Sequence, residues 1–469
     1  MNMDPLLLLP ELLLFLGGLS VLLLGSFLPR RRQWIAAVLT ATVLVLVMAA
    51  TAFTFGDPTL TAYAGTEAVD IATRAVRFLA PLGTLLVVAL AAEEVRGDRR
   101  ESETYALLLF ATTGTVLLAG ANDLLVLAVA FLLTSIPLYA LIGLGGTAKA
   151  AEAAMKTYLL GSIFGILMLV GIALLASLGG SSIYSELKEG LGDAPIAPVI
   201  LGVLFVLSGI LFKAGGVPAH YWVPDAAQAS GAAVAAFVTT VPKVGAVVAI
   251  YRLVVALPET ADWGLLVALL AAAGMVIGNL AAYFQNDPRR LLGWSTVGQV
   301  GFLLIPPAVA TPEGLPLSAL LLYLAAYVLT NIAAFAVIAA EPGRRDLAEY
   351  RGLARTRPWL AAALVVALLG LVGTPPLAVF LGKVTVTAAA LDGDALWLAL
   401  VLLVTTVISL FYYLRWLIIP FRSVPEGPPA EFARRPWAGT VAVAAATGSL
   451  LLGLGAGLAW GAFTGELAI

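Results

Sequence analysis

Apolar residues run in blocks of about 20 along the whole chain, separated by short segments rich in charge, Gly or Pro. Blocks of this length match helices that cross a hydrocarbon core roughly 30 Å thick. The pattern predicts about fourteen spans, which start near residues 5, 33, 75, 105, 124, 155, 196, 232, 263, 291, 316, 358, 394 and 437. We therefore expect an all-α, polytopic membrane protein that forms one membrane domain over residues 1–469.

Composition narrows the classes of function that this protein can have. Only 12% of its 469 residues are charged, about half the share in soluble domains, which excludes a soluble globular enzyme. Cysteine is missing and His220 is the single histidine, so thiolate iron–sulfur, redox-dithiol and zinc sites are not expected. Basic residues are few and dispersed, and nucleic-acid binding is not expected either. We predict no cofactor and no metal in this chain.

Basic residues gather on alternate predicted loops. These loops hold Arg30–Arg32; Arg96, Arg99 and Arg100; Lys149; Arg289 and Arg290; Arg344, Arg345, Arg351, Arg355 and Arg357; and Arg422, Arg434 and Arg435. Only Arg74, Arg77 and Lys188 lie on the opposite loops. Because cytoplasmic loops are enriched in Lys and Arg, both termini are predicted to face away from the cytoplasm.

Six basic residues fall inside spans or at their edges: Lys156, Lys213, Lys243, Arg252, Lys383 and Arg415. A charge at the bilayer centre costs about 2.5–3.5 kcal/mol on insertion scales, so such residues mark candidate functional sites. Snorkelling from a helix end is an equally good interpretation for Lys156, Arg252 and Arg415.

The other three lysines stand beside helix breakers. Lys213 precedes Gly-Gly-Val-Pro, Lys243 follows Pro242, and Lys383 comes after Gly-Thr-Pro-Pro at 373–376. Interrupted membrane helices are tolerated where they line a hydrated cavity or are buried in protein, and transporters place ion sites there. A plain packing kink is the alternative. The broken spans begin near 196 and 358, five spans apart, which suggests two inverted five-helix repeats.

Several motifs in consistent order over about residues 5–420 carry a family resemblance. They are ANDLLVL at 121–127, SIPLY at 135–139, EAAMKTYLLGS at 152–162, FKAGGVPAHYWVPDA at 212–226, GNL at 278–280, RRLLGWS at 289–295, YRGL at 350–353, GTPP at 373–376, FLGK at 380–383 and YYLR at 412–415. Together they resemble the antiporter-like membrane subunits of proton-pumping NADH:quinone oxidoreductase (respiratory complex I), most closely its subunit N. The wider family includes Mrp-type sodium/proton antiporter subunits and membrane-bound hydrogenases.

The resemblance implies a division of the chain and a set of site residues. Helices 1–3 would occupy 1–104, the first repeat 105–257, the second repeat 258–420 and the last helix 421–469, with broken helices 7 and 12. Lys213, Lys243 and Lys383 would form a midplane proton path driven by quinone reduction elsewhere in the complex. His220 and Lys156 are further candidates for this path, although His220 is also typical of an interfacial residue. Asp225 is an N-cap candidate for the second half of the break.

The resemblance also implies an assembly. This chain would be a non-redox subunit of a translocating enzyme in a bacterial-type inner membrane, within a hetero-oligomer that includes antiporter-like neighbours. NADH, FMN, iron–sulfur clusters and quinone would bind to other subunits.

Two positions depart from the family pattern. Leu132 occupies the place of a glutamate that normally pairs with the helix 7 lysine, so Lys213 needs a counter-ion from Glu152 or from a neighbouring subunit. Gln299 stands where relatives often have histidine. Two alternatives therefore stay open: an Mrp-type cation/proton antiporter subunit, and a structural membrane subunit that no longer conducts.

Overall fold

The computed structural model describes residues 5–423 and 435–468, and it confirms an all-α, polytopic membrane protein. Thirteen helices in these ranges are long and apolar enough to cross a membrane. They are α1 (Leu9–Phe27), α2 (Trp34–Phe53), α3 (Ile71–Glu94), α4 (Glu101–Gly120), α5 (Leu124–Gly143), α6 (Ala148–Gly179), α8 (Ile196–Ala214), α10 (Ala232–Ala256), α11 (Trp263–Tyr283), α12 (Pro288–Leu303), α14 (Leu315–Ala340), α18 (Leu396–Leu417) and α19 (Pro436–Leu454).

Shorter elements connect these spans. Two apolar helices, α16 (Pro358–Val372) and α17 (Ala378–Asp392), follow one another around the Gly-Thr-Pro-Pro segment. The remaining helices are α7 (Tyr184–Gly192), α9 (Trp222–Ala229), α13 (Ile305–Ala308), α15 (Leu353–Thr356) and α20 (Ala456–Ala459). One antiparallel hairpin pairs β1 (Leu60–Ala62) with β2 (Glu67–Val69).

Most spans begin within four residues of the positions that the apolar pattern predicts. The exception is α6, which starts at Ala148 instead of near 155. Its first turns contain Lys149, Glu152 and Lys156, which lower the local hydropathy although the backbone is already helical. The hydroxyl of Thr147 caps this helix by accepting a hydrogen bond from the backbone N–H of Ala150 at 3.1 Å. Hydropathy locates the apolar part of a helix and not its capped end.

Two helices end at left-handed glycines beside the lysines. Helix α8 ends at Ala214, Gly215 has φ +77°, and α9 begins seven residues later at Trp222. Helix α16 ends at Val372, Gly373 has φ +89°, and α17 begins at Ala378. Glycine adopts this conformation without a Cβ clash, so the chain leaves each helix abruptly. The inverted repeat that we expect from these breaks stays a prediction.

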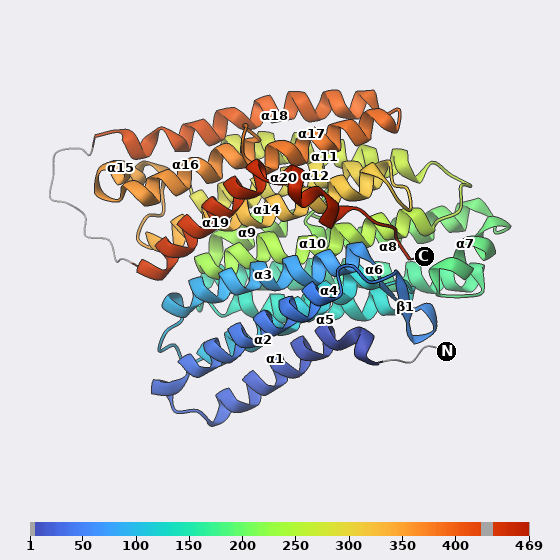
Figure 1. Cartoon of the computed structure of the whole chain (residues 1–469), viewed down its shortest axis with the longest axis horizontal. Coiled ribbons are helices and arrows are strands. Elements are labelled where there is room, and N and C mark those ends of the chain that lie inside the picture. The colour runs from blue at the N-terminus through green and yellow to red at the C-terminus, as the bar shows by residue number, and fades with distance from the viewer. Residues whose placement is uncertain (1–4, 424–434, 469) are drawn as a thin grey trace.

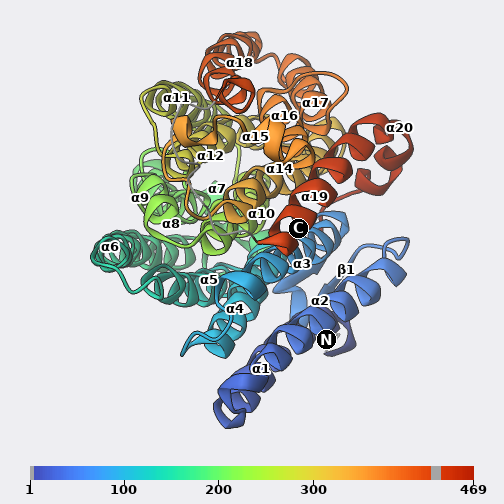
Figure 2. The ribbon, with the colours of Figure 1, turned by 90° about the vertical axis from the view of Figure 1, so that its left-hand side faces the viewer.

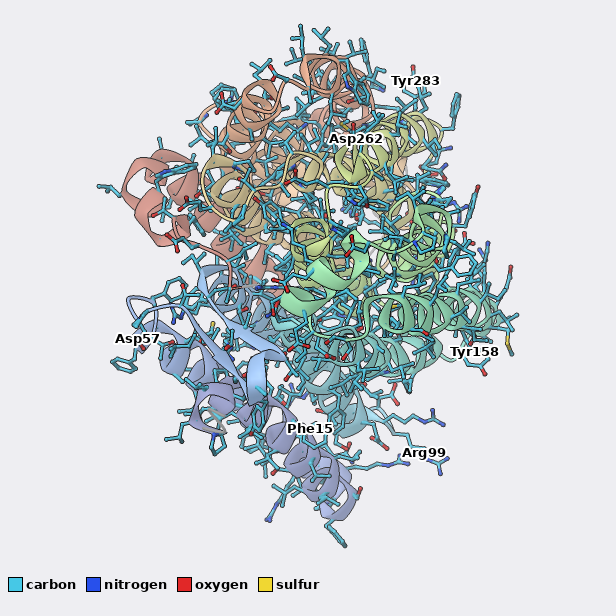
Figure 3. All side chains as sticks on the ribbon, turned by 90° about the vertical axis from the view of Figure 1, so that its right-hand side faces the viewer. Phe15, Asp57, Arg99, Tyr158, Asp262 and Tyr283 are labelled. Atoms are coloured by element: carbon cyan, nitrogen blue, oxygen red, sulfur yellow. The ribbon has the colours of Figure 1, made fainter. Side chains whose placement is uncertain are left out.

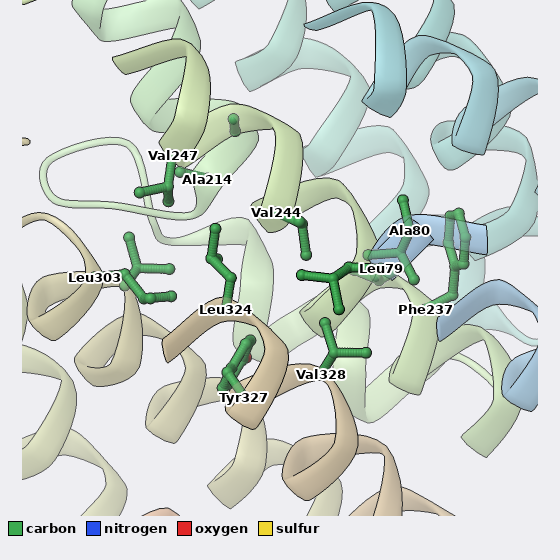
Figure 4. Close-up of a cluster of buried hydrophobic side chains, with 14 of the residues drawn as sticks. Leu79, Ala80, Ala214, Phe237, Val244, Val247, Leu303, Leu324, Tyr327 and Val328 are labelled. Carbon is green, nitrogen blue, oxygen red and sulfur yellow. The ribbon is translucent and has the colours of Figure 1, made fainter. Parts of the chain in front are cut away.

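The helices lie side by side in a flat bundle with α10 and α14 inside it and α1 and α2 at one edge (Figures 1 and 2). Every residue in the apolar window of α10 is buried, whereas α2 and α6 expose most of theirs. Leu79, Val244 and Val328 from α3, α10 and α14 meet in the centre (Figure 4). Helices that are apolar all round belong in such a core, and those with an exposed apolar face contact lipid or another subunit.

The two ends of the bundle differ in charge. The connections that follow α1 and α3 lie at the left in Figure 1, and so does α15. These parts of the chain are rich in arginine. The β1–β2 hairpin and α7 lie at the opposite end. Figure 3 looks onto that end, and Asp57 and Asp262 are labelled on it. Arg434, which we assigned to a basic loop, lies outside the described residues. Which end faces the cytoplasm stays a prediction.

Helices α4 and α10 approach closely where Gly245 faces the backbone of α4. A Cβ added at Gly245 would overlap the carbonyl oxygen of Thr115. Small residues allow such contacts between membrane helices, where van der Waals packing replaces the hydrophobic driving force.

We therefore expect Gly245→Ala to destabilise the protein by about 1–3 kcal/mol, because the two backbones must separate. The thermal unfolding midpoint of the detergent-solubilised protein should fall. Gly439→Ala is the matched control, since a Cβ at Gly439 meets no atom within 4 Å. Equal midpoints for the two variants would contradict the close contact.

Candidate functional site

The three lysines beside the helix breaks are all buried in the bundle. Lys213 lies in the last turn of α8, Lys243 in the middle of α10, and Lys383 in α17. Their exposed fractions are 0%, 0% and 4%. None of the three forms a salt bridge within the described part of the chain. A positive charge on any of these lysines is therefore stabilised by neutral groups and not by a carboxylate of the described residues.

The end of α8 supplies those groups to Lys243. Its Nζ donates a hydrogen bond to the carbonyl oxygen of Lys213 at 3.3 Å and lies 4.5 Å from the centre of the Trp222 ring. Trp222 is fixed in turn, because its indole N–H donates to the carbonyl oxygen of Phe212 at 3.0 Å. The last carbonyls of a helix lack partners and carry partial negative charge, which favours a cation there.

The end of α16 provides the same kinds of contact to Lys383. Its Nζ donates to the carbonyl oxygen of Val372 at 2.9 Å and to Oγ1 of Thr406 at 3.0 Å. The ring of Phe302 lies 4.0 Å away, centre to Nζ. Two different helix breaks thus place a C-terminal carbonyl and an aromatic face around a lysine.

Lys213 has the fewest polar contacts of the three lysines. Its Nζ has no hydrogen-bond partner among the described residues and lies 5.3 Å from the centre of the Phe131 ring on α5. Leu132, at the position of the missing glutamate, points outward and is 44% exposed. The aromatic face of Phe131, the residue before Leu132, therefore attracts the ammonium group of Lys213.

Neither acidic residue near α5 replaces that glutamate. Glu152 is exposed on α6, so the expectation that it serves as the counter-ion of Lys213 finds no contact here. Asp123 caps α5 through the backbone N–H groups of Leu125 and Val126, and its other oxygen accepts from Ser182. A carboxylate from a neighbouring subunit remains the second prediction.

A polar link that we did not predict lies between the second break and α14. Gln299 donates from its amide to the carbonyl oxygen of Leu371 at 3.0 Å, and its amide oxygen accepts from the hydroxyl of Tyr323 at 2.7 Å. Nearby, the hydroxyls of Ser295 and Tyr413 form a hydrogen bond. The signal in the sequence was the set of polar residues inside apolar spans, since such residues are rare unless they have partners.

Lys156 and Asp225 lie away from the buried lysines. Lys156 is exposed and pairs with Asp225, which also accepts from Arg290 at 2.5 Å. Snorkelling therefore describes Lys156 better than a place among the buried lysines. The N-cap assignment of Asp225 is wrong, because α9 begins at Trp222 and Asp225 lies in its first turn. Its carboxylate instead ties α6 and α12 to α9.

His220 and Arg252 are both buried. His220 lies in the break after α8, with its ring 4.2 Å from that of Tyr221 and 5.6 Å from that of Trp294. Arg252 is fully buried and pairs with Asp70 at 2.9 Å, so exposure to solvent at a helix end is the wrong interpretation for it. An ion pair across distant segments leaves no local pattern in the sequence.

Among residues 5–423 and 435–468, no group of three or more His, Asp or Glu side chains is placed to hold a metal ion. The buried polar side chains in these ranges include ammonium, guanidinium, carboxyl, hydroxyl, amide, indole and imidazole groups.

Comparisons with known proteins identify the family of this chain. A family model described as NADH:quinone oxidoreductase/Mrp antiporter, transmembrane, matches residues 121–409. An NADH-quinone oxidoreductase subunit N from Mycobacterium sp. (strain JLS) is 55% identical over 459 residues, which is 98% of each chain. One from Streptomyces griseus is 46% identical over 97% of each chain.

Two solved structures share the fold. A chain of respiratory complex I from Thermus thermophilus matches with a TM-score of 0.83 and 33% identity, covering 97% of this chain and 99% of that one. A chain of the Mrp complex from Dietzia sp. matches with a TM-score of 0.86 at 22% identity, over 98% and 95%. The resemblance inferred from the motifs is thus confirmed, and the chain belongs to the NADH:quinone oxidoreductase/Mrp antiporter family of membrane proteins.

Proposed function

We propose that this chain is the antiporter-like membrane subunit of an NADH:quinone oxidoreductase and that it moves protons along Lys213, Lys243 and Lys383. The observation that carries the proposal is the placement of the three lysines. All three are buried, and two of them bind a carbonyl oxygen in the last turn of an interrupted helix. The names of its relatives support the same assignment.

Proton movement follows from repulsion between neighbouring ammonium groups. Lys243 binds the backbone of Lys213 itself, so the two side chains belong to one electrostatic unit. In a poorly screened interior, a proton on one lysine disfavours a proton on the next. A charge that changes elsewhere in the complex would then shift the proton from lysine to lysine.

Aromatic rings hold the ammonium groups in this path without neutralising them. Phe131, Trp222 and Phe302 each lie 4.0–5.3 Å from one Nζ. A cation–π contact contributes about 0.5–2 kcal/mol, much less than a buried carboxylate would. A lysine held in this way gives up its proton more readily than one in a buried ion pair.

The redox groups belong to other subunits under this proposal. NADH, FMN, iron–sulfur clusters and quinone would bind there, and this chain would work within a hetero-oligomer in a bacterial-type inner membrane. The exposed apolar faces of α5 and α6, including Leu132, Ile136 and Ile163, are available to lipid or to an antiporter-like neighbour. Both termini would face away from the cytoplasm.

The same tests distinguish the proposed function from two other functions. The Mrp complex shares the fold, so sodium-dependent transport without any redox partner would favour an antiporter subunit. The unpaired Lys213 is what a structural subunit that has lost conduction would also contain.

We expect Lys213→Ala to lower the number of protons translocated per electron in proteoliposomes of the assembled complex, because one station of the path is lost. NADH oxidation should continue. Lys149→Ala, which removes an exposed lysine, is the matched control and should keep the wild-type ratio. An unchanged ratio for Lys213→Ala would identify the chain as a structural subunit.

The ring of Phe131 is tested separately. We expect Phe131→Leu to slow proton translocation by about two- to thirtyfold, the equivalent of about 0.5–2 kcal/mol of lost cation–π attraction. Phe131→Tyr keeps an aromatic face and should keep the rate. Thermal unfolding midpoints of both complexes show whether packing has changed. Equal rates for the Leu and Tyr variants would rule out the role of the ring.

A further inference from the structure

A second buried charge cluster lies at the end of the bundle that carries the β1–β2 hairpin (Figure 1). The hairpin folds back over the end of α4, where Glu67 forms a β-bridge with Ala121. Glu67 is 2% exposed. A Cβ at Gly120 would overlap Oε1 of Glu67, so the last residue of α4 leaves room for the carboxyl.

The guanidinium groups around Glu67 are already paired with other carboxylates. Arg77 donates to both oxygens of Glu11, at 2.7 and 3.0 Å. Arg252 donates to Asp70, with 2.9 Å to the nearer oxygen. Both carboxyl oxygens of Glu67 are buried and have no hydrogen-bond partner among the described residues. Among Glu11, Asp70, Glu67, Arg77 and Arg252, Glu67 is the acid without a hydrogen-bond or ion-pair partner in the described part of the chain.

The charged groups that act on Glu67 come from three helices around it, α1, α3 and α10. Glu11 on α1 and Asp70 at the start of α3 repel a negative charge there, while Arg77 on α3 and Arg252 on α10 attract one. The end of α4 contributes only Gly120 and Ala121. Burial raises the pKa of Glu67 well above its usual value, and the charge of Glu11 raises it further.

A neutral carboxyl fits this position and a charged one does not. An ionised carboxylate in a buried site needs a directly paired cation or several hydrogen-bond donors. Glu67 has neither among the described residues, because Arg77 and Arg252 are paired with Glu11 and Asp70. One bound proton removes the charge of Glu67. We propose that Glu67 is a proton-binding site, separate from the lysines, at the end of the bundle opposite the arginine-rich loops.

The same cluster holds the C-terminal segment of the chain. The backbone N–H of Ala468 donates to Asp70 at 2.9 Å, and Arg252 donates to the carbonyl oxygen of Ala468 at 2.8 Å. Loss of the proton from Glu67 would add a negative charge beside Asp70 and compete for Arg252. Proton binding at Glu67 therefore stabilises the attachment of the hairpin and the C-terminal segment to α3 and α10.

Infrared difference spectra between acidic and alkaline pH test this site in the assembled complex. The wild type should show the carbonyl stretch of a buried protonated carboxyl, and Glu67→Gln should lose that band. Glu189→Gln, which changes an exposed acid on α7 at the same end, should keep it. A wild-type spectrum that the Glu67→Gln substitution leaves unchanged would overturn the proposal.

Assembly and stability give a second readout. Because the amide is neutral, Glu67→Gln should assemble normally; assembly of Glu67→Asp but not of Glu67→Gln would show that the charge is needed and would also overturn the proposal. Between the usual pKa of glutamate, about 4.3, and the raised pKa of Glu67, unfolding releases one proton. Stability is thus greatest below this window and falls as pH rises through it, by up to about tenfold per pH unit in the unfolding equilibrium. Glu67→Gln should remove that slope, and a slope equal to that of Glu189→Gln would contradict the proposal.

Discussion

The high cost of an ammonium group in a membrane interior governs the centre of this molecule. Lys243 and Lys383 meet that cost through the unpaired carbonyls at the ends of α8 and α16, together with an aromatic face. These carbonyl oxygens lie where the helices end, since the interior of a helix bonds its carbonyl groups internally. The chain leaves both helices abruptly at Gly215 and Gly373.

The sequence predicts this part of the structure because the determinants are local. Apolar run length locates the spans, and Gly and Pro beside a lysine indicate where a helix stops. The same reasoning misses the first turns of α6, where Thr147 caps a polar helix start. It also misses the pairs Arg252–Asp70 and Arg77–Glu11, because their partners are distant in sequence and only the packed fold brings them together.

The position of the missing glutamate shows that one residue alone does not determine the surroundings of Lys213. Leu132 points out of the bundle, while Phe131 beside it faces Lys213. Gln299 likewise replaces a titratable ring with an amide that binds the end of α16 and the hydroxyl of Tyr323. In both places neutral groups form the contacts, so the proposed path depends on the lysines as its titratable groups.

A high-resolution density map of the native assembly would test the central claim most directly, since a proton path through Lys213, Lys243 and Lys383 requires water between them. Our account predicts a continuous row of ordered water molecules that joins the three Nζ atoms, with Phe131 still facing Lys213. Dry, apolar packing along the route from Lys213 and Lys243 to Lys383 would contradict it.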